Sequence, residues 1–280
     1  MAALRVGRKA FTKRYDDRTR ALLKMAVSLP DRPSADEIHN FRVAARRIQV
    51  MRRLMPRTVR GSQGPKRLDF ALRTVLKATS KLRDMDTLLD TLKSRQGSLP
   101  DGLLVNLENQ RSDAAARTKE SVKVLSDATA PRLDALELRG KRLSKRLRKG
   151  LRKYSKEASS LVTEVLSDES KGVELHSLRK EVKKIRYLTE LADKPPRRLS
   201  SLVKWQESLG AIHDLDVAVA YLKVIGVGSG KAVYELQRAR HFKYLAFVRD
   251  YKTAQMHAVA EGELLPVAVL APTDFSPVEA

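Results

Sequence analysis

The sequence predicts an all-α protein made of two four-helix-bundle repeats. Aromatic residues make up only 5% of the chain and glycines are few, which favours helix packing over a sheet. Apolar residues recur at helical spacing, and no alternating strand pattern of useful length occurs. The 280 residues, of which 42% are hydrophobic, are enough for a sizeable core.

Breakers and caps divide the chain into eight expected helices. The stretch Leu29-Pro30-Asp31-Arg32-Pro33 ends the first helix, and Ser34 with Glu37 forms a capping box that starts the second. Pro131 is expected to open the fifth helix, which is long and basic. The expected helices cover residues 8–28, 34–55, 66–93, 103–125, 131–166, 175–192, 199–224 and 231–256, with loops at 56–65 and 96–102 and a glycine-rich turn at 226–230.

The expected helices form one domain over residues 1–260, with repeats at about 1–128 and 129–260. A pseudo-twofold axis between the repeats would bring equivalent surfaces together around one central groove or channel. The remaining residues 261–280 carry four acidic residues, three prolines and no basic residue. We expect them to form a loose C-terminal tail.

The formal net charge of +23 limits the classes of partner. So much positive charge destabilises a compact chain unless a polyanion is near, so nucleic acid, an anionic membrane surface and polyphosphate are the candidates. The chain has no cysteine, which excludes disulfides and thiolate chemistry. It has no secretory signal at its start and no apolar run long enough to span a bilayer. We therefore expect a cytoplasmic protein without membrane insertion.

A motif that reads His-x-x-Arg-x-x-x-(Arg/Lys)-(Arg/Lys)-Ile occurs twice. At about 100° per residue, most cations of each copy fall on one side of a helix and the apolar residues on another. A third basic stripe keeps the same spacing along the fifth helix. Arginine offers forked donors for phosphate oxygens and lysine a mobile point charge, so we predict polyanion binding by all three stripes. Their residues are His39, Arg42, Arg46, Arg47 and Arg53; His176, Arg179, Lys183, Lys184 and Arg186; and Arg139, Arg142, Arg146, Lys149 and Lys153.

A second motif, Asp-(Met/Leu)-Asp, recurs at Asp84/Asp86 and at Asp214/Asp216. These copies lie 130 positions apart and the histidine motifs 137, so two motifs repeat in order, which argues for duplication. Residues two apart on a helix diverge by about 200°, so one ion cannot readily be held by both aspartates. We expect one aspartate of each pair to hold an arginine or histidine. Arg83 is expected either to join the basic lining or to pair with a neighbouring aspartate.

The histidines of the two motifs stand beside arginines, which disfavour a further positive charge on the ring. Contact with phosphate and a structural hydrogen bond to a neighbouring helix fit His39 and His176 equally well. Metal ligation fits less, because the neighbouring cations oppose a divalent ion. No metal site and no cofactor are predicted.

Four motifs in order resemble the CHAD family, the conserved-histidine α-helical domain. They read His-x-x-Arg-x-x-x-Arg-Arg, Arg-Asp-Met-Asp, His-x-x-Arg-x-x-x-Lys-Lys-x-Arg-Tyr and Leu-Gly-x-x-x-Asp-Leu-Asp, and the resemblance extends to about residue 256. His213 departs from it, since the family often has asparagine there. The resemblance implies two helical halves around a basic cavity, binding of inorganic polyphosphate, and association with polyphosphate granules and their proteins.

The resulting hypothesis is a non-catalytic polyphosphate-binding module. Nonspecific nucleic-acid binding is the alternative, although scarce aromatics disfavour a stacking platform for single strands and no helix-turn-helix signature occurs. A metal-dependent phosphohydrolase is less favoured, because it needs clustered carboxylates that the sequence does not supply.

Overall fold

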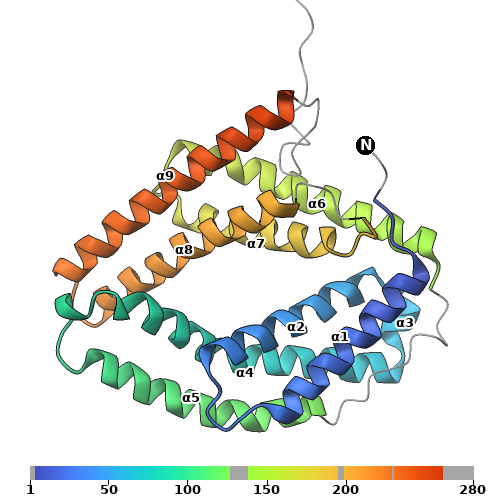
Figure 1. Cartoon of the computed structure of the whole chain (residues 1–280), viewed down its shortest axis with the longest axis horizontal. Helices are drawn as coiled ribbons and strands as arrows, with labels where there is room; N and C mark the ends of the chain where they lie inside the picture. The colour runs from blue at the N-terminus through green and yellow to red at the C-terminus, as the bar shows by residue number, and fades with distance from the viewer. Residues whose placement is uncertain (1–3, 127–137, 195–198, 229, 261–280) are drawn as a thin grey trace, which may run out of the picture.

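The computed structural model describes residues 4–126, 138–194, 199–228 and 230–260. These residues form helices and connecting segments, with no strand among them (Figure 1), and the all-α prediction is confirmed. The helices are α1 (Arg8–Ser28), α2 (Ala35–Leu54), α3 (Arg57–Gly61), α4 (Gln63–Lys93), the 3-10 helix η1 (Gln96–Ser98), α5 (Leu103–Ser126), α6 (Gly140–Ser167), α7 (Gly172–Thr189), α8 (Leu199–Val224) and α9 (Lys231–Ala260).

The predicted capping box forms at the start of α2. The Glu37 backbone N–H donates to Ser34 Oγ at 3.2 Å, and the Ser34 N–H donates to Glu37 Oε2 at 2.7 Å. Two of the orphan donors at the helix start are satisfied in this way. The contacts fix where α2 begins and therefore the register of its basic residues.

The loop predicted over residues 56–65 is wrong, because this stretch forms α3 and the first turn of α4. Pro56 stands at the N-cap of α3, and Pro65 lies in the first turn of α4. A proline there is tolerated, since the first amides of a helix have no intrahelical acceptor to lose. The helix signal was therefore present, but the two prolines and the nearby glycines concealed it.

The fifth predicted helix also differs, since α6 begins at Gly140 and the two residues before it are not helical. The expected start at Pro131 lies outside the described residues, as do the proline pair at 195–196 and the tail at 261–280. Helix α7 begins and ends three residues earlier than predicted. Helix α8 has the predicted bounds.

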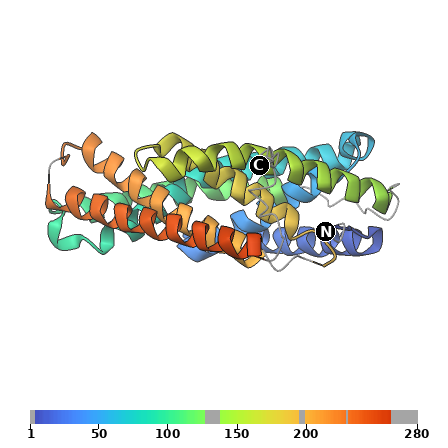
Figure 2. The same cartoon turned by 90° about the horizontal axis from the view of Figure 1, so that it is seen from above.

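The helices divide into two groups that face each other (Figure 1). The first group is α1–α5 and the second is α6–α9, and α2 and α4 contact α7 and α8 where the groups meet. Figure 2 shows that most helices run along the long axis of the molecule. Basic residues of α2 and α7 are thereby brought to a shared boundary.

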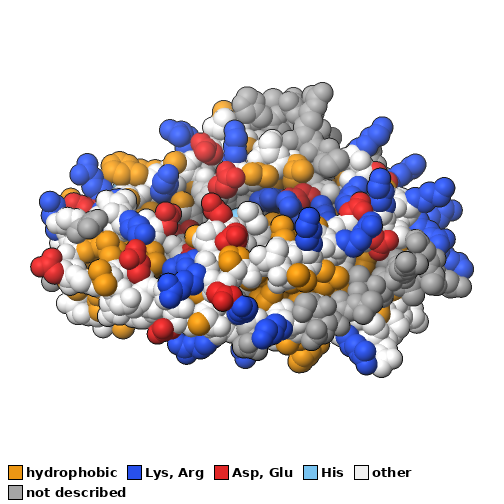
Figure 3. Space-filling view, turned by 60° about the horizontal axis from the view of Figure 1, so that its bottom comes forward, with side chains coloured by type: hydrophobic (Ala, Val, Ile, Leu, Met, Phe, Trp, Pro, Cys, Tyr) orange, Lys and Arg blue, Asp and Glu red, His pale blue; other side chains and the backbone are white. Residues whose placement is uncertain are grey.

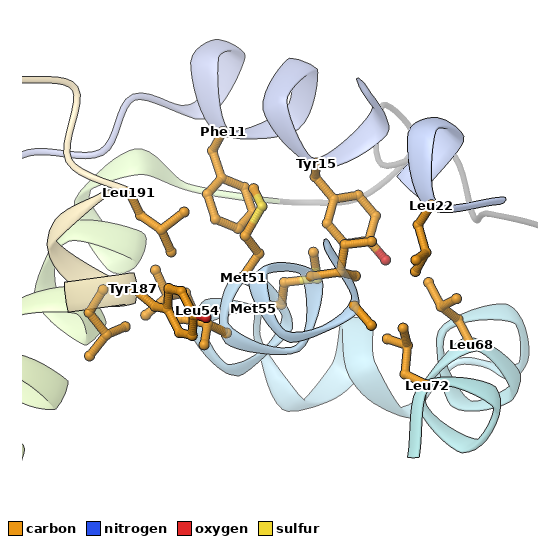
Figure 4. Packing of buried hydrophobic residues seen from close by; sticks show 14 of the residues in the cluster. Phe11, Tyr15, Leu22, Met51, Leu54, Met55, Leu68, Leu72, Tyr187 and Leu191 are labelled. Carbon is orange, nitrogen blue, oxygen red and sulfur yellow. The ribbon is translucent and has the colours of Figure 1, made fainter. Parts of the chain in front are cut away.

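Two apolar cores are shared between the groups. In the first, Phe11, Tyr15 and Leu22 of α1 pack onto α2 and α4, and Tyr187 of α7 joins them (Figure 4). The second joins the end of α4 and the start of α5 to the end of α8 and the start of α9, with Leu92 among its buried residues. Burial of these side chains stabilises the boundary near the two ends of α4. The middle of the boundary is left to polar and charged residues.

Candidate anion-binding site

Six basic side chains from both groups of helices meet between the two shared cores. Lys183 of α7 is partly buried, and its pKa is lowered to about 8 by burial and by the positive charges of Arg179, Arg46, Arg42 and Arg186. Burial and the positive charges of Arg83 and Lys183 also lower the pKa of His39 on α2. Charges shift a pKa in this way only at short range, so the stripes of α2 and α7 converge. The central cluster consists of His39, Arg42, Arg46, Arg83, Arg179 and Lys183.

Arg42 is held in place by α4. Its Nη1 donates to Leu76 O at 2.8 Å and to Thr79 Oγ1 at 2.7 Å. Burial and the neighbouring Arg46 lower the pKa of its guanidinium, which is half-buried. Arg46 is exposed and donates to Gln49 Oε1 at 3.1 Å. The side chain of Arg42 is therefore preorganised, whereas that of Arg46 keeps more freedom.

Arg179 lies against α8, where a glycine leaves room for it. A Cβ at Gly210 would stand 3.8 Å from Arg179 Nε, so a large side chain there would compete with the guanidinium. Two carboxylates border this place, Asp84 of α4 and Asp214 of α8. Burial raises the pKa of both carboxyls, and Arg179 and Arg83 act in the opposite direction on each. The central cluster therefore has counter-charges on its α4–α8 side.

The second aspartate of each pair holds an arginine, as predicted. Asp86 Oδ1 accepts a hydrogen bond from Arg111 Nε at 2.5 Å, and Asp216 Oδ1 accepts one from Arg240 Nε at 2.7 Å. The side chain of Asp86 is only 1% exposed. These ion pairs tie α4 to α5 and α8 to α9.

His176 pairs with His213 of α8. Their Nδ1 atoms are 3.2 Å apart and their ring centroids 4.4 Å, so one ring donates and the other accepts. Burial, Arg179 and the partner ring lower the pKa of His213 to about 4, which keeps it neutral near pH 7. Of the two roles predicted for His176, these contacts support the structural one. His39 is exposed, and no described residue forms a hydrogen bond with its ring.

Three of the binding residues predicted on α2 and α7 are ion-paired. Arg47 Nε lies 3.3 Å from Glu190 Oε2, and Arg186 Nε lies 2.9 Å from Glu190 Oε1, so one carboxylate bridges α2 and the end of α7. Lys184 pairs with Glu181, and its Nζ lies 4.9 Å from the centroid of the Tyr154 ring. Lys184 therefore faces α6 and lies outside the central cluster.

A basic hollow of about 430 Å³ lies where the end of α2, α3 and α6 meet, apart from the central cluster. Burial, Arg60 and Arg142 lower the pKa of Arg146, whose Nη1 donates to Leu54 O at 3.1 Å. Arg139 is exposed ahead of α6 and is not part of the lining. The hollow, named the α6 groove, is lined by Arg53, Met55, Arg57, Arg60, Arg146, Lys149, Gly150 and Lys153.

A family model described as the CHAD domain matches residues 13–223, which include both histidine motifs and both aspartate pairs. The chain belongs to the CHAD domain family. The crystal structure of the CHAD domain from the plant Ricinus communis is similar over 97% of this chain and 94% of its own, with a TM-score of 0.53. The two are 17% identical, so this similarity concerns the fold. The comparison with curated proteins found no match.

Basic side chains are unevenly spread over this CHAD domain. Figure 3 shows lysine and arginine gathered toward the end that holds α1 and α3, and some of them lie in a recess. Acidic side chains are interspersed over the remainder of this face. None of the helices in the described ranges is long and apolar enough to cross a membrane.

Sequence reasoning missed Arg57 and Arg60 of the α6 groove. They fell in the predicted loop, although their spacing of three places them on one side of a helical turn. It also did not decide whether Arg83 joins the basic lining or pairs with an aspartate. This CHAD domain has Arg83 in the central cluster, where its charge lowers the pKa of His39.

Proposed function

We propose that this CHAD domain binds inorganic polyphosphate through the central cluster. The observation that carries the proposal is the convergence of two stripes on Lys183, whose pKa falls to about 8 among the neighbouring arginines. Such a gathering of like charges opposes folding unless an anion is bound. A phosphate polymer presents repeated oxyanions, which match forked and mobile donors arranged in this way.

Confinement favours polyphosphate over nucleic acid. The central cluster lies at a boundary between two helix groups that is packed by apolar cores at both ends. A narrow polymer without bases suits such a place better than a duplex, which prefers an open basic surface. Nonspecific nucleic-acid binding at the exposed cations of α6 remains the alternative, and the experiment below separates the two.

We further propose binding without hydrolysis, at polyphosphate granules in the cytoplasm. A phosphohydrolase uses clustered carboxylates to hold metal ions. Here Asp86 and Asp216 are engaged by arginines, and Asp84 and Asp214 lie among arginines that oppose a divalent cation. Protein partners at the granule belong to the same proposal.

The two helix groups are proposed to be repeats around a shared polyanion path. Matched contacts support this: the arginines that hold Asp86 and Asp216 also donate from Nη2 to a backbone carbonyl of the segment before α2 and before α7. Arg111 donates to Pro33 O at 2.6 Å, and Arg240 donates to Glu169 O at 2.8 Å. In addition, α2 contacts its counterpart α7, and α4 contacts its counterpart α8.

A titration with long-chain polyphosphate at several salt concentrations tests the proposed ligand, with duplex DNA of matched charge as the comparison. We expect polyphosphate to stay bound at salt concentrations that release DNA, because Arg42 is preorganised and Lys183 is partly buried. Binding can be followed by calorimetry. If polyphosphate and DNA bound with equal affinity and equal salt dependence, binding would instead be due to a generic basic surface.

Polyphosphate binding is expected to take up protons at pH 8, because Lys183 then lacks its proton in about half of the free molecules. A bound polyanion raises the pKa of Lys183, so about half a proton enters per site, and affinity falls as the pH rises above 8. Calorimetry in buffers of different ionisation enthalpy measures the uptake. Lys183→Arg keeps the charge but cannot lose it, so this variant should show little uptake; uptake equal to that of the wild type would contradict the assignment.

A further inference from the structure

The α6 groove is basic on both of its walls. Arg57 and Arg60 come from α3, while Arg146, Lys149 and Lys153 come from α6. Among the described residues, the one carboxylate paired with these five is Glu157, whose Oε1 lies 3.8 Å from Lys153 Nζ on an exposed surface. Exposed pairs of this kind neutralise little. The groove therefore lacks an internal counter-charge such as Glu190 supplies at the boundary between α2 and α7.

One arginine of the groove is oriented by a hydrogen bond, and another has a buried N–H without an acceptor. Arg146 is oriented by its hydrogen bond to Leu54 O at the end of α2. Arg60 Nε is buried, and no described residue accepts a hydrogen bond from it. The charges of Arg60 and Arg142 also lower the pKa of Arg146. A phosphate oxygen is an acceptor of the kind that Arg60 lacks, and its charge would relieve this repulsion.

Helix α2 carries basic residues of both the central cluster and the groove. Arg46 of the cluster and Arg53 of the groove are two helical turns apart, about 10 Å along the axis, on the same side of the helix. The charge of Arg53 lowers the pKa of Arg46, so the two guanidinium groups are near each other. A linear ligand that follows this side of α2 from Arg46 to Arg53 would therefore pass from the central cluster to the groove.

We propose that the α6 groove is a second polyanion site, occupied by the same polyphosphate chain that fills the central cluster. This inference rests on the proposed function and adds a preference for chain length. A chain held at one site is at high effective concentration at the other, so a chain that spans both gains affinity without any new protein contact. A short phosphate oligomer occupies one site and gains nothing.

The double variant Arg57→Gln/Arg60→Gln tests this, because it removes two charges from the groove and touches no residue of the central cluster. Its affinity for long-chain polyphosphate is expected to fall about tenfold or more, with a salt dependence reduced by about two counterions. Its affinity for tripolyphosphate should change less than about twofold. Calorimetric titrations with both ligands at one pH give these ratios, and circular dichroism verifies the helical fold.

The matched control is Arg67→Gln/Arg73→Gln, which removes the same charge from exposed positions of α4. It should leave both affinities near those of the wild type. The second site would be overturned if Arg57→Gln/Arg60→Gln kept its affinity for long-chain polyphosphate, or lost affinity equally for both ligands. An equal loss in both double variants would overturn it too. Each of these results would leave the proposed function standing. A wild-type protein that binds neither phosphate ligand would overturn the proposed function, and the second site with it.

Discussion

Replacing Arg179 and Lys183 by glutamine is expected to weaken long-chain polyphosphate binding by about a hundredfold or more, because two charge-assisted contacts are lost from the central cluster. The same change should raise the melting temperature of the unliganded protein. Burial and neighbouring cations lower the pKa of Lys183 to about 8, so the folded state disfavours its charge at neutral pH. Calorimetry measures the first effect and a thermal melt the second.

A matched control removes two charges elsewhere. Lys141 and Lys145 are exposed on α6 and do not line the α6 groove. Their change to glutamine should leave the melting temperature nearly unchanged and reduce binding only slightly, as expected for solvated cations. Undiminished binding by the Arg179→Gln/Lys183→Gln variant would place the ligand elsewhere. A lower melting temperature would mean that the structural contacts of these side chains outweigh their mutual repulsion.

Asp86→Ala is expected to lower the free energy of unfolding by about 3–5 kcal/mol, since it leaves the guanidinium of Arg111 without its counter-ion between α4 and α5. The Asp86 side chain is almost completely buried, so water cannot replace the lost carboxylate. Denaturant unfolding, followed by circular dichroism, gives the value. Asp90→Ala, one turn further along α4 at an exposed position, should change the free energy by about 0.5 kcal/mol or less. Equal effects of the two variants would refute a structural role for the Asp86–Arg111 pair.

Local signals in the sequence were enough to predict most of the helices. The capping box at Ser34 and Glu37 and the apolar spacing of α2 depend on residues within a few turns of one another, and both formed as predicted. The failure at α3 is of the same local kind, because Pro56 and Pro65 can end a helix or begin one. Helical geometry also predicted that one aspartate of each pair would hold an arginine or histidine, and the structure shows that these are Asp86 and Asp216.

The partners of the basic residues depended on tertiary structure. The motifs do not distinguish Arg47 and Arg186 from the arginines of the central cluster. In the structure, however, Arg47 and Arg186 both form ion pairs with Glu190. His213, a departure from the family pattern, turned out to be the partner of His176. Helical periodicity fixes the side of a helix on which a charge lies, and that information is local. Whether the charge meets a carboxylate, another cation or open solvent depends on which helices pack together, and for this chain that was decided by the apolar cores that join α1–α5 to α6–α9.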